Sequence, residues 1–349
     1  MDDYAYINAR VRALRGDLLD QRAYEQLLVQ PDIPSARDCL ARTVYGKRVG
    51  DIPGGAPIMV LEEWLREEWS RTVSKLHRMT EGRSREHLEV VLGRWEVENI
   101  KAILRGKRAD IGISEILATV LPTGLFDGPA LAELARQPSI QAIVDLLTTW
   151  RSHYARPLRE ALRAHRELKG LEPLELALDH YYFEDAKRRL EEGNHSALLL
   201  RKLIGLLIDR VNLLTAFKIF SGGATSRSEI PNYFIKGGIH LPIQVYDALV
   251  RAQGLMEVIE VIRKTPYSSS VKGLEGEQRG IPSSLRLERG LDQIILERVR
   301  AMSTSDPLGI GLLVGYLLQK YHEVGNLRMI LRAKAYGMYS EDVRSLLVM

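Results

Sequence analysis

Cysteine is almost absent from this sequence of 349 residues, with Cys39 as its single example. One cysteine excludes an intramolecular disulfide and a metal site built from several thiolates, which fits a reducing compartment. Aromatic residues are also scarce, at 7% of the chain, whereas unbranched helix-forming residues are plentiful. Such side chains lose little rotamer freedom in a helix, so the composition predicts an all-α fold.

Long apolar runs are missing as well. The longest uncharged run, LGIGLLVGYLL at 308–318, has 11 residues, whereas a membrane-spanning helix needs about 20. The N-terminal MDDYAY is acidic and no apolar segment follows it, which argues against an export signal. We therefore expect no direct transmembrane span, so that any association with a membrane depends on a partner.

Neither the charged residues nor the glycines form a motif that is typical of a catalytic or ligand-binding site. The net charge is +4, but bases alternate with acids along helix-like segments, which disfavours nucleic-acid binding. The phosphate loop, the H-E-x-x-H zinc motif and the G-x-S-x-G nucleophile elbow are absent. The glycines of 309–315 lack the G-x-G-x-x-G spacing of a dinucleotide site. The sequence thus predicts no catalytic residue, no cofactor and no metal site.

Two of these glycines have a structural interpretation. Gly311 and Gly315 lie four residues apart on one helical face, where the missing Cβ lets another helix approach closely. The helix that carries them is expected to begin at Asp306-Pro307, an N-cap acceptor followed by proline, and to run to about Tyr336.

A repeat of 113 or 114 residues is what the sequence does contain. The segments EVENIKAILRGK (96–107), DRVNLLTAFKIF (209–220) and EVGNLRMILRAK (323–334) share an acid, an asparagine three residues later and a closing base. The asparagines are Asn99, Asn212 and Asn326, and the bases are Arg105, Lys218 and Arg332. A Leu-Glu-x-x-Leu pattern recurs at the same interval, with its acids at Glu62, Glu175 and Glu288. Repetition at one spacing indicates a structural unit copied along the chain.

Two further markers occur in the same order. A glycine before a helix-like run recurs at Gly16, Gly124 and Gly238. A threonine–aromatic pair recurs at Thr43-x-Tyr45, Thr148-x-Trp150 and Thr265-x-Tyr267. On this basis the stretch 4–16 is aligned with 112–124 and 227–238. Three helical repeat domains are therefore expected, at 1–108, 109–223 and 224–349, and Gly-, Pro- or Ser-rich linkers at 50–57, 221–226 and 268–284.

The repeated polar residues are interpreted as structural. An asparagine flanked by apolar residues usually hydrogen-bonds a neighbouring element and fixes its register, as one buried asparagine can in a coiled coil. The acids of the Leu-Glu-x-x-Leu pattern are expected to pair with the bases that close the asparagine segments. A ligand-binding role for the repeated residues is the less favoured alternative.

Three like units in one chain suit a pseudo-threefold ring, which closes its own interfaces instead of leaving unpaired ends. Two other classes of function stay open at this point. An all-α enzyme working in the central hole would need acids or histidines that converge there. A basic scaffold for nucleic acid would need a stripe of bases on one face and an affinity that falls steeply with salt.

Several longer segments carry a resemblance to a known family. They are YAYINARVRALRGDLL (4–19), NLLTAFK (212–218), YFIKGG (233–238), TPYSS (265–269) and DPLGIGLLVGYL (306–317). In this order along the whole chain, they resemble the C-type subunits of archaeal and bacterial A/V-type rotary ATPases, which are equivalent to the d-type subunits of vacuolar ATPases.

The resemblance implies a funnel of three similar helical domains around a central cavity. It implies a non-catalytic rotor subunit that couples the central shaft to the membrane proteolipid ring, so that both turn together during ATP-linked proton or sodium transport. The implied partners are the coiled-coil shaft subunit with its small companion, and the cytoplasmic loops of the proteolipid ring. The implied location is the cytoplasmic face of the membrane, and no family catalytic residue is carried over.

Overall fold

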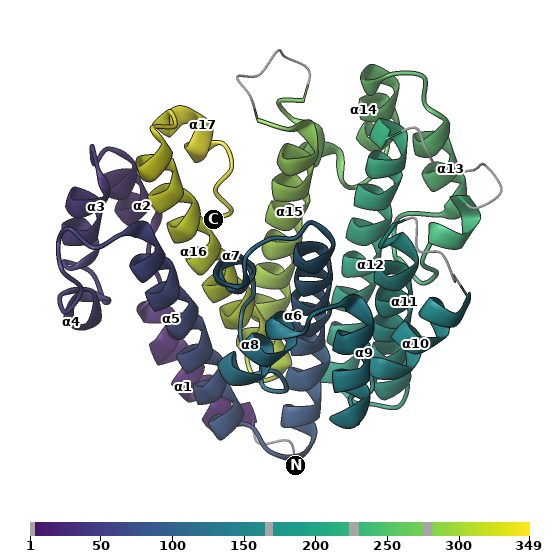
Figure 1. The fold of residues 1–349 in the computed structure, drawn as a ribbon, viewed down its shortest axis with the longest axis horizontal. Coiled ribbons are helices and arrows are strands. Elements are labelled where there is room, and N and C mark those ends of the chain that lie inside the picture. Colours follow the sequence, from purple (N-terminus) through teal and green to yellow (C-terminus); the bar gives the residue numbers. More distant parts are fainter. Residues whose placement is uncertain (1–3, 165–169, 223–229, 275–280) are drawn as a thin grey trace. The chain divides into compact units, whose positions relative to one another are not determined.

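The computed structural model describes residues 4–164, 170–222, 230–274 and 281–349, and within these ranges every regular element is a helix (Figure 1). The predicted all-α fold class is confirmed for these residues. The residues group into two compact units, which we describe separately.

The first unit comprises residues 59–192. Two long helices are followed by a series of shorter ones and a final long one. They are α5 (Ile58–Met79), α6 (Gly82–Arg108), α7 (Ile113–Thr119), α8 (Gly128–Arg136), α9 (Ile140–Thr149), α10 (Ala155–Ala164) and α11 (Glu172–Arg189).

The second unit joins residues 4–58 to residues 193–349. From its first segment come α1 (Tyr4–Gly16), α2 (Gln21–Leu28), α3 (Ile33–Leu40) and α4 (Gly46–Val49). From its second come α12 (His195–Gly222), the 3₁₀ turn η1 (Ile230–Tyr233), α13 (Ile243–Arg251), α14 (Leu255–Arg263), η2 (Ser268–Val271), α15 (Ser283–Ser305), α16 (Ile310–Tyr336) and α17 (Ser340–Arg344). Helices α1, α12 and α15 pack against α16.

Side-chain caps fix where several short helices begin. In each, the N-cap oxygen accepts a hydrogen bond from a backbone N–H of the first turn, which would otherwise be unpaired. The pairs are Asp20 with Ala23 (2.8 Å), Asp32 with Ser35 (2.8 Å), Asp127 with Ala130 (2.9 Å) and Ser139 with Ala142 (3.1 Å). Local sequence therefore sets the beginnings of α2, α3, α8 and α9.

The helix expected from Asp306 begins four residues later, at Ile310, so that prediction was wrong at its N-terminal end. Asp306 instead ends α15, because its N–H donates to the carbonyl of Met302. Its predicted C-terminal end at Tyr336 is confirmed, and Gly337 follows with φ of 67°, the left-handed conformation that glycine adopts without steric penalty.

Of the predicted linkers, 50–57 is confirmed as the helix-free connection between α4 and α5. The linker at 221–226 begins inside α12 and continues outside the described residues. The linker at 268–284 begins with η2, ends inside α15, and lies partly outside the described residues.

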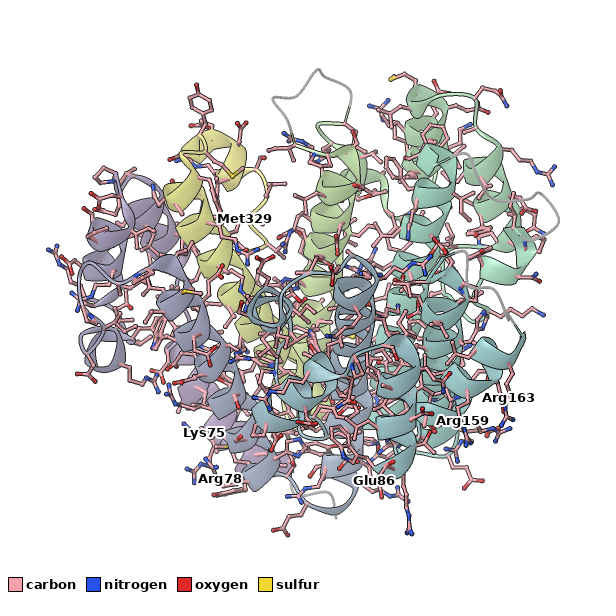
Figure 2. The ribbon with its side chains drawn as sticks, viewed as in Figure 1. Lys75, Arg78, Glu86, Arg159, Arg163 and Met329 are labelled. Atoms are coloured by element: carbon pink, nitrogen blue, oxygen red, sulfur yellow. The ribbon has the colours of Figure 1, made fainter. Side chains whose placement is uncertain are left out.

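Apolar side chains fill most of the interior of each unit, and many of the charged ones lie on exposed faces (Figure 2). On α10, Leu158 and Ala161 are buried, whereas Arg159 and Arg163 point to solvent. In the core of the first unit, Trp69 lies edge-on to Trp95, with ring centroids 5.2 Å apart. Such close packing gives these interiors the low compressibility of an organic crystal.

Candidate functional site

The three repeated asparagines are buried, and each holds one residue of a non-helical segment by two hydrogen bonds. The side-chain Nδ2 donates to a backbone carbonyl, and the side-chain Oδ1 accepts the N–H of the same residue. The pairs are Asn99 with Leu121 (2.6 and 2.9 Å), Asn212 with Ile235 (2.8 and 2.9 Å) and Asn326 with Val348 (2.7 and 3.1 Å). We call this pairing the asparagine link. It satisfies a buried amide, which would be costly to leave unpaired.

The acid three residues before each asparagine accepts a hydrogen bond from a buried tyrosine hydroxyl. The pairs are Glu96 with Tyr154 (2.9 Å), Asp209 with Tyr267 (2.7 Å) and Glu323 with Tyr45. We call this pairing the tyrosine link. Hydrogen bonds to a charged acceptor are stronger than neutral ones, so each link ties a long helix firmly to a distant loop.

The tyrosine link corrects one marker read from the sequence. In the first unit the marker was Thr148-x-Trp150, yet Trp150 is 39% exposed and Tyr154 makes the contact. Ser152 takes the place of the threonine, because its hydroxyl accepts the N–H of Tyr154 (3.4 Å). Thr43 and Thr265 accept the N–H of Tyr45 and Tyr267 in the same way, at 3.3 and 3.2 Å.

The three acids differ in their remaining donors. Glu96 accepts one more side-chain bond, from Thr123 at 3.3 Å, and its burial raises its pKa to about 7. Asp209 accepts three backbone N–H groups of 239–241. Glu323 accepts the N–H of Leu19 and the ammonium of Lys320, at 2.5 and 2.7 Å. The third copy thus carries a buried cation of its own.

The bases that close the asparagine segments do not all behave alike. Arg105 binds Glu175 with two hydrogen bonds, at 2.6 and 2.7 Å, which is a pair of the kind expected from the sequence, although the sequence did not say which acid meets which base. Glu288 was expected to pair with one of the closing bases, but it pairs with Arg210 (2.8 Å), whose guanidinium also binds Asp292 (2.6 Å). A guanidinium can span two acids one helical turn apart, whereas an ammonium is a single point charge. Lys218 itself is exposed.

The remaining acid and the remaining arginine of the two patterns, Glu62 and Arg332, belong to different units. Glu62 is buried in α5, and Arg332 is exposed on α16.

Of the three repeated glycines, two have no room for a side chain and the third has open space around it. A Cβ on Gly238 would lie 1.8 Å from Oδ1 of Asp209, and one on Gly124 would lie 1.9 Å from Nε2 of His77. A Cβ on Gly16 would meet no described atom within 4 Å. Gly16 ends α1, a helix of 13 residues, whereas the aligned stretch 112–124 holds only the 7-residue α7. The alignment of 4–16 with 112–124 was therefore wrong, and α17 is the counterpart of α7, since each lies between an asparagine helix and the residue that its asparagine holds.

Gly311 and Gly315 face α15. A Cβ on Gly315 would lie 2.3 Å from the hydroxyl of Ser303, and one on Gly311 would lie 3.0 Å from the carbonyl of Met302. The Ser303 hydroxyl donates to the carbonyl of Gly311 at 2.5 Å. The two helices approach so closely that a methyl group at Gly315 would displace the Ser303 hydroxyl from this bond.

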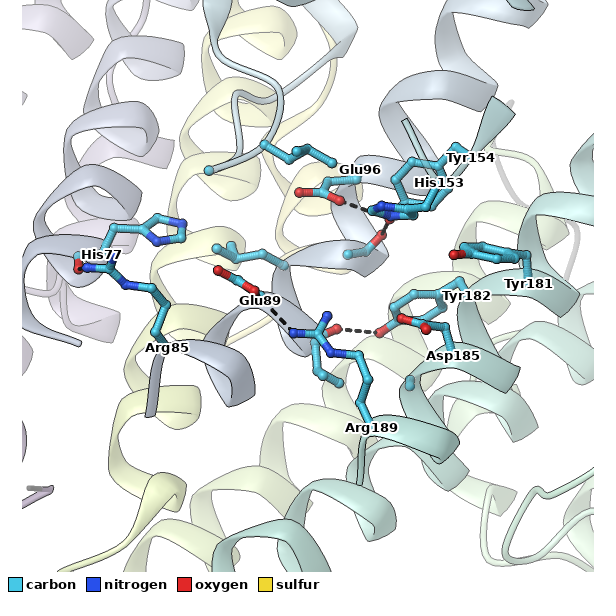
Figure 3. Close-up of a pocket in the computed structure, with 16 residues that line it drawn as sticks. His77, Arg85, Glu89, Glu96, His153, Tyr154, Tyr181, Tyr182, Asp185 and Arg189 are labelled. Atoms are coloured by element: carbon cyan, nitrogen blue, oxygen red, sulfur yellow. Dashed lines mark hydrogen bonds and ion pairs between the residues drawn. The ribbon is translucent and has the colours of Figure 1, made fainter. Parts of the chain in front are cut away.

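A cavity of about 330 Å³ opens in the first unit between α5, α6 and α11 (Figure 3). Its wall includes His77 from α5, Glu89 and Glu96 from α6, and Tyr181 and Arg189 from α11. Burial lowers the pKa of His77, which favours its neutral form. Glu96 and Tyr154, which form the first tyrosine link, line this cavity.

The charged groups of this wall contact one another or the backbone. Arg189 pairs with Glu89 (3.1 Å), and Arg85 donates to the carbonyls of Thr80 (3.0 Å) and His77 (2.6 Å). The cavity therefore presents no concentrated charge of one sign to a ligand. In the parts of the chain that the structure describes, three or more His, Cys, Asp or Glu side chains nowhere gather in a way that could hold a metal ion. None of the helices in those parts is long and apolar enough to span a bilayer.

Sequence reasoning missed Tyr154, Arg210 and Lys320. A search for any small hydroxyl residue two positions before a tyrosine would have found Ser152-x-Tyr154. No sequence signal distinguished Arg210 from the other bases of α12, because its partners lie about 80 residues away.

Comparison with known proteins gives a match along nearly the whole chain. Residues 7–346 match the family described as ATP synthase (C/AC39) subunit. The chain is 30% identical over 341 residues to the C-type subunit of the V-type ATP synthase of Thermus thermophilus, which covers 97% of this chain and 96% of that protein. It is 27% identical over 347 residues to the C-type subunit of the A-type ATP synthase of Methanocaldococcus jannaschii, which covers 99% of this chain and 86% of that protein. This chain belongs to the ATP synthase C/AC39 subunit family.

Proposed function

We propose that this chain is a non-catalytic central-rotor subunit of an A/V-type ATP synthase or ATPase. In this role it is a funnel-shaped adapter that couples the central shaft to the membrane proteolipid ring, so that both rotate together during ATP-linked proton or sodium transport. Its partners are the coiled-coil shaft subunit with its small companion and the cytoplasmic loops of the ring. It is held on the cytoplasmic face of the membrane by these partners.

The order of the tyrosine links supports a pseudo-threefold arrangement of the three repeat domains 1–108, 109–223 and 224–349. Glu96 of the first repeat binds Tyr154 of the second, and Asp209 of the second binds Tyr267 of the third. Glu323 of the third repeat binds Tyr45 of the first. Each repeat thus makes the same contact with the next in cyclic order, the pattern of a heterologous interface that closes on itself. This cyclic order is the observation that carries the proposal.

A rotary adapter has to transmit torque without absorbing it. The long helices α6, α12 and α16 are tied at the middle by buried hydrogen bonds to loops that are distant in sequence. Close-packed helical walls with such ties resist deformation, because protein interiors have low compressibility. Mechanical coupling is a role for which this chain needs rigidity and no reacting groups.

Co-purification tests the proposal. An affinity-tagged chain, expressed in place of the native one, is isolated from gently solubilised membranes at moderate salt, with untagged cells as the control. We expect the shaft subunit, its companion and the proteolipid to be recovered in fixed stoichiometry, and the purified chain alone to hydrolyse no ATP. Recovery of nucleic acid without these subunits, or turnover of a substrate by the chain alone, contradicts it.

A further inference from the structure

The third copy of the two links is assembled differently from the first two. In the first copy, Leu121 and Tyr154 follow Asn99 along one continuous segment, and Ile235 and Tyr267 follow Asn212 likewise. In the third copy Val348 follows its asparagine, but the tyrosine is 278 residues away in the opposite direction. Along the chain, the helices α2 to α4 that complete this copy are covalently joined to the rest of their unit through α1 on one side and through residues 59–192 on the other.

This difference changes what the asparagine holds. Asn99 is hydrogen-bonded to the backbone of Leu121, a few residues before α8 begins at Gly128. It therefore fixes the segment that leads directly into the short helices. Asn326 holds the backbone of Val348, which belongs to the segment 337–349 after α16 and not to the segment that leads into α2. We call residues 337–349 the strap and residues 17–57 the flap.

Side-chain amides fasten the strap at two consecutive residues. Asn326 binds both backbone groups of Val348, and Gln293 of α15 binds both backbone groups of Met349, at 2.8 and 2.9 Å. Leu346 and Val348 are each 2% exposed. The C-terminal part of the strap is therefore buried, and its bonds to α15 and α16 do not involve the flap.

The strap in turn holds the flap. Arg344 pairs with Glu25 of α2 at 2.6 Å, and the hydroxyl of Ser340 donates to the carbonyl of Leu28 at 2.9 Å. The Tyr24 hydroxyl of α2 is hydrogen-bonded to the side chain of Asn326. The flap's helices have 8, 8 and 4 residues, and helices this short depend on tertiary contacts for their stability.

We infer that the strap acts as a latch for α2 and for α3, which packs on it, so that these two helices open more readily when the strap is released. The first two copies are built without a separate strap, because the segment that their asparagines hold leads directly into the short helices. The flap then remains attached at its two chain ends, through α1 and α5, and by direct bonds to α16, where Glu323 binds Leu19 and Tyr45 and Lys334 binds the carbonyl of Leu28. At the α1 end the hold is independent of the strap, since Asn8 donates to the carbonyl of Gly309 at 3.1 Å and Arg12 to that of Pro307 at 2.9 Å.

Hydrogen–deuterium exchange of the full chain tests this inference with a matched pair of variants. Gln293→Ala removes the clamp on Met349, which lies in the strap and not in the flap. Glu297→Ala removes the other side-chain partner of Gln293, at 2.9 Å on α15, and leaves the strap clamp in place. We expect Gln293→Ala to speed exchange of α2 and α3 by about tenfold or more, because local opening sets the exchange rate of such segments. Glu297→Ala should leave these rates unchanged.

Peptides from α8, α9, α13 and α14, the short helices of the first two copies, serve as internal references, and their rates should not change in either variant. Removal of Val348 and Met349 is a stronger release and should raise flap exchange further. If Gln293→Ala speeds exchange only in the strap, or equally in the flap and the reference helices, the latch does not exist.

Discussion

The hydroxyl of Tyr154 donates to the carboxylate of Glu96 across 58 residues of sequence, at 2.9 Å, and both groups are buried. This bond ties the middle of α6 to the loop before α10. It is one of three equivalent contacts, and among the described residues the side-chain donors to this carboxylate are hydroxyls rather than bases. Of the three tyrosine links, the first should therefore depend most on the protonation of its acid and on the loss of its tyrosine hydroxyl.

Removal of the Tyr154 hydroxyl should destabilise the protein. Tyr154→Phe keeps the ring but leaves the Glu96 carboxylate with one donor fewer, so we expect the free energy of unfolding to fall by about 1–3 kcal/mol. Urea denaturation followed by circular dichroism measures this change. Trp150→Phe is the control, since Trp150 is partly exposed and is not the residue that meets Glu96, and it should change stability by no more than about 0.5 kcal/mol. A larger loss of stability from Trp150→Phe than from Tyr154→Phe would show that Trp150, as the sequence pattern predicted, is the equivalent of Tyr45 and Tyr267.

The pKa of Glu96 predicts a pH dependence of stability. Burial raises this pKa from 4.5 to about 7, so between these values the folded state binds more protons than the unfolded state. Stability from this group is therefore present at low pH and is lost as the pH rises through 7, by at most about 3 kcal/mol. Glu96→Gln should flatten this part of the profile in urea titrations between pH 5 and pH 8. Glu160→Gln, at an exposed position on α10, should leave the profile as it is in the wild type.

The buried pair of Lys101 and Asp179 should be more important than exposed pairs. Their side chains are 5% and 10% exposed, and Nζ lies 2.5 Å from Oδ1. Lys101→Ala leaves the Asp179 carboxylate buried with Arg94 as its nearby base, at 3.6 Å, so we expect a loss of about 3 kcal/mol. Arg156→Ala breaks the exposed pair with Glu160 and should have a much smaller effect on stability, because solvent screens such pairs. Equal losses in the two variants would show that burial does not govern these pairs.

The close approach of α15 and α16 predicts opposite effects of one substitution at two glycines of α16. Gly315→Ala places a methyl group against Ser303 and should destabilise by about 1–3 kcal/mol. Gly325→Ala meets no described atom within 4 Å and should stabilise by up to about 1 kcal/mol, since alanine favours the helix. Thermal unfolding measures both. Adding Ser303→Ala to Gly315→Ala should recover part of the loss, and no recovery would place the clash elsewhere.

Some of the site was predictable because its signals are local. The asparagine segments, with an acid three residues before each asparagine, recur along the chain, and the two glycines of α16 lie four residues apart on one helical face. A contact between the acids of one pattern and the closing bases of the other was also expected, and Arg105 with Glu175 is such a pair, although the sequence did not assign the partners. The beginning of α16 was not, because Asp306 is an equally good end for the preceding helix.

Partners across long distances could not be read from the pattern. The choice of Tyr154 over Trp150, and of Arg210 over Lys218, depends on which residue the path of the chain brings to the acid. The strap is a further case, since nothing in the sequence of 337–349 marks Val348 as the counterpart of Leu121.

The sequence by itself determined that this protein is helical, that it carries one pattern three times, and that it belongs with the C-type subunits of rotary ATPases. These properties follow from local propensity and from residue order, which need no knowledge of long-range contacts. Only the tertiary structure decided which tyrosine meets each acid, and that the third copy takes its tyrosine from the first 58 residues. A hydrogen bond depends on positions within a few tenths of an ångström, and packing over the whole chain sets those positions.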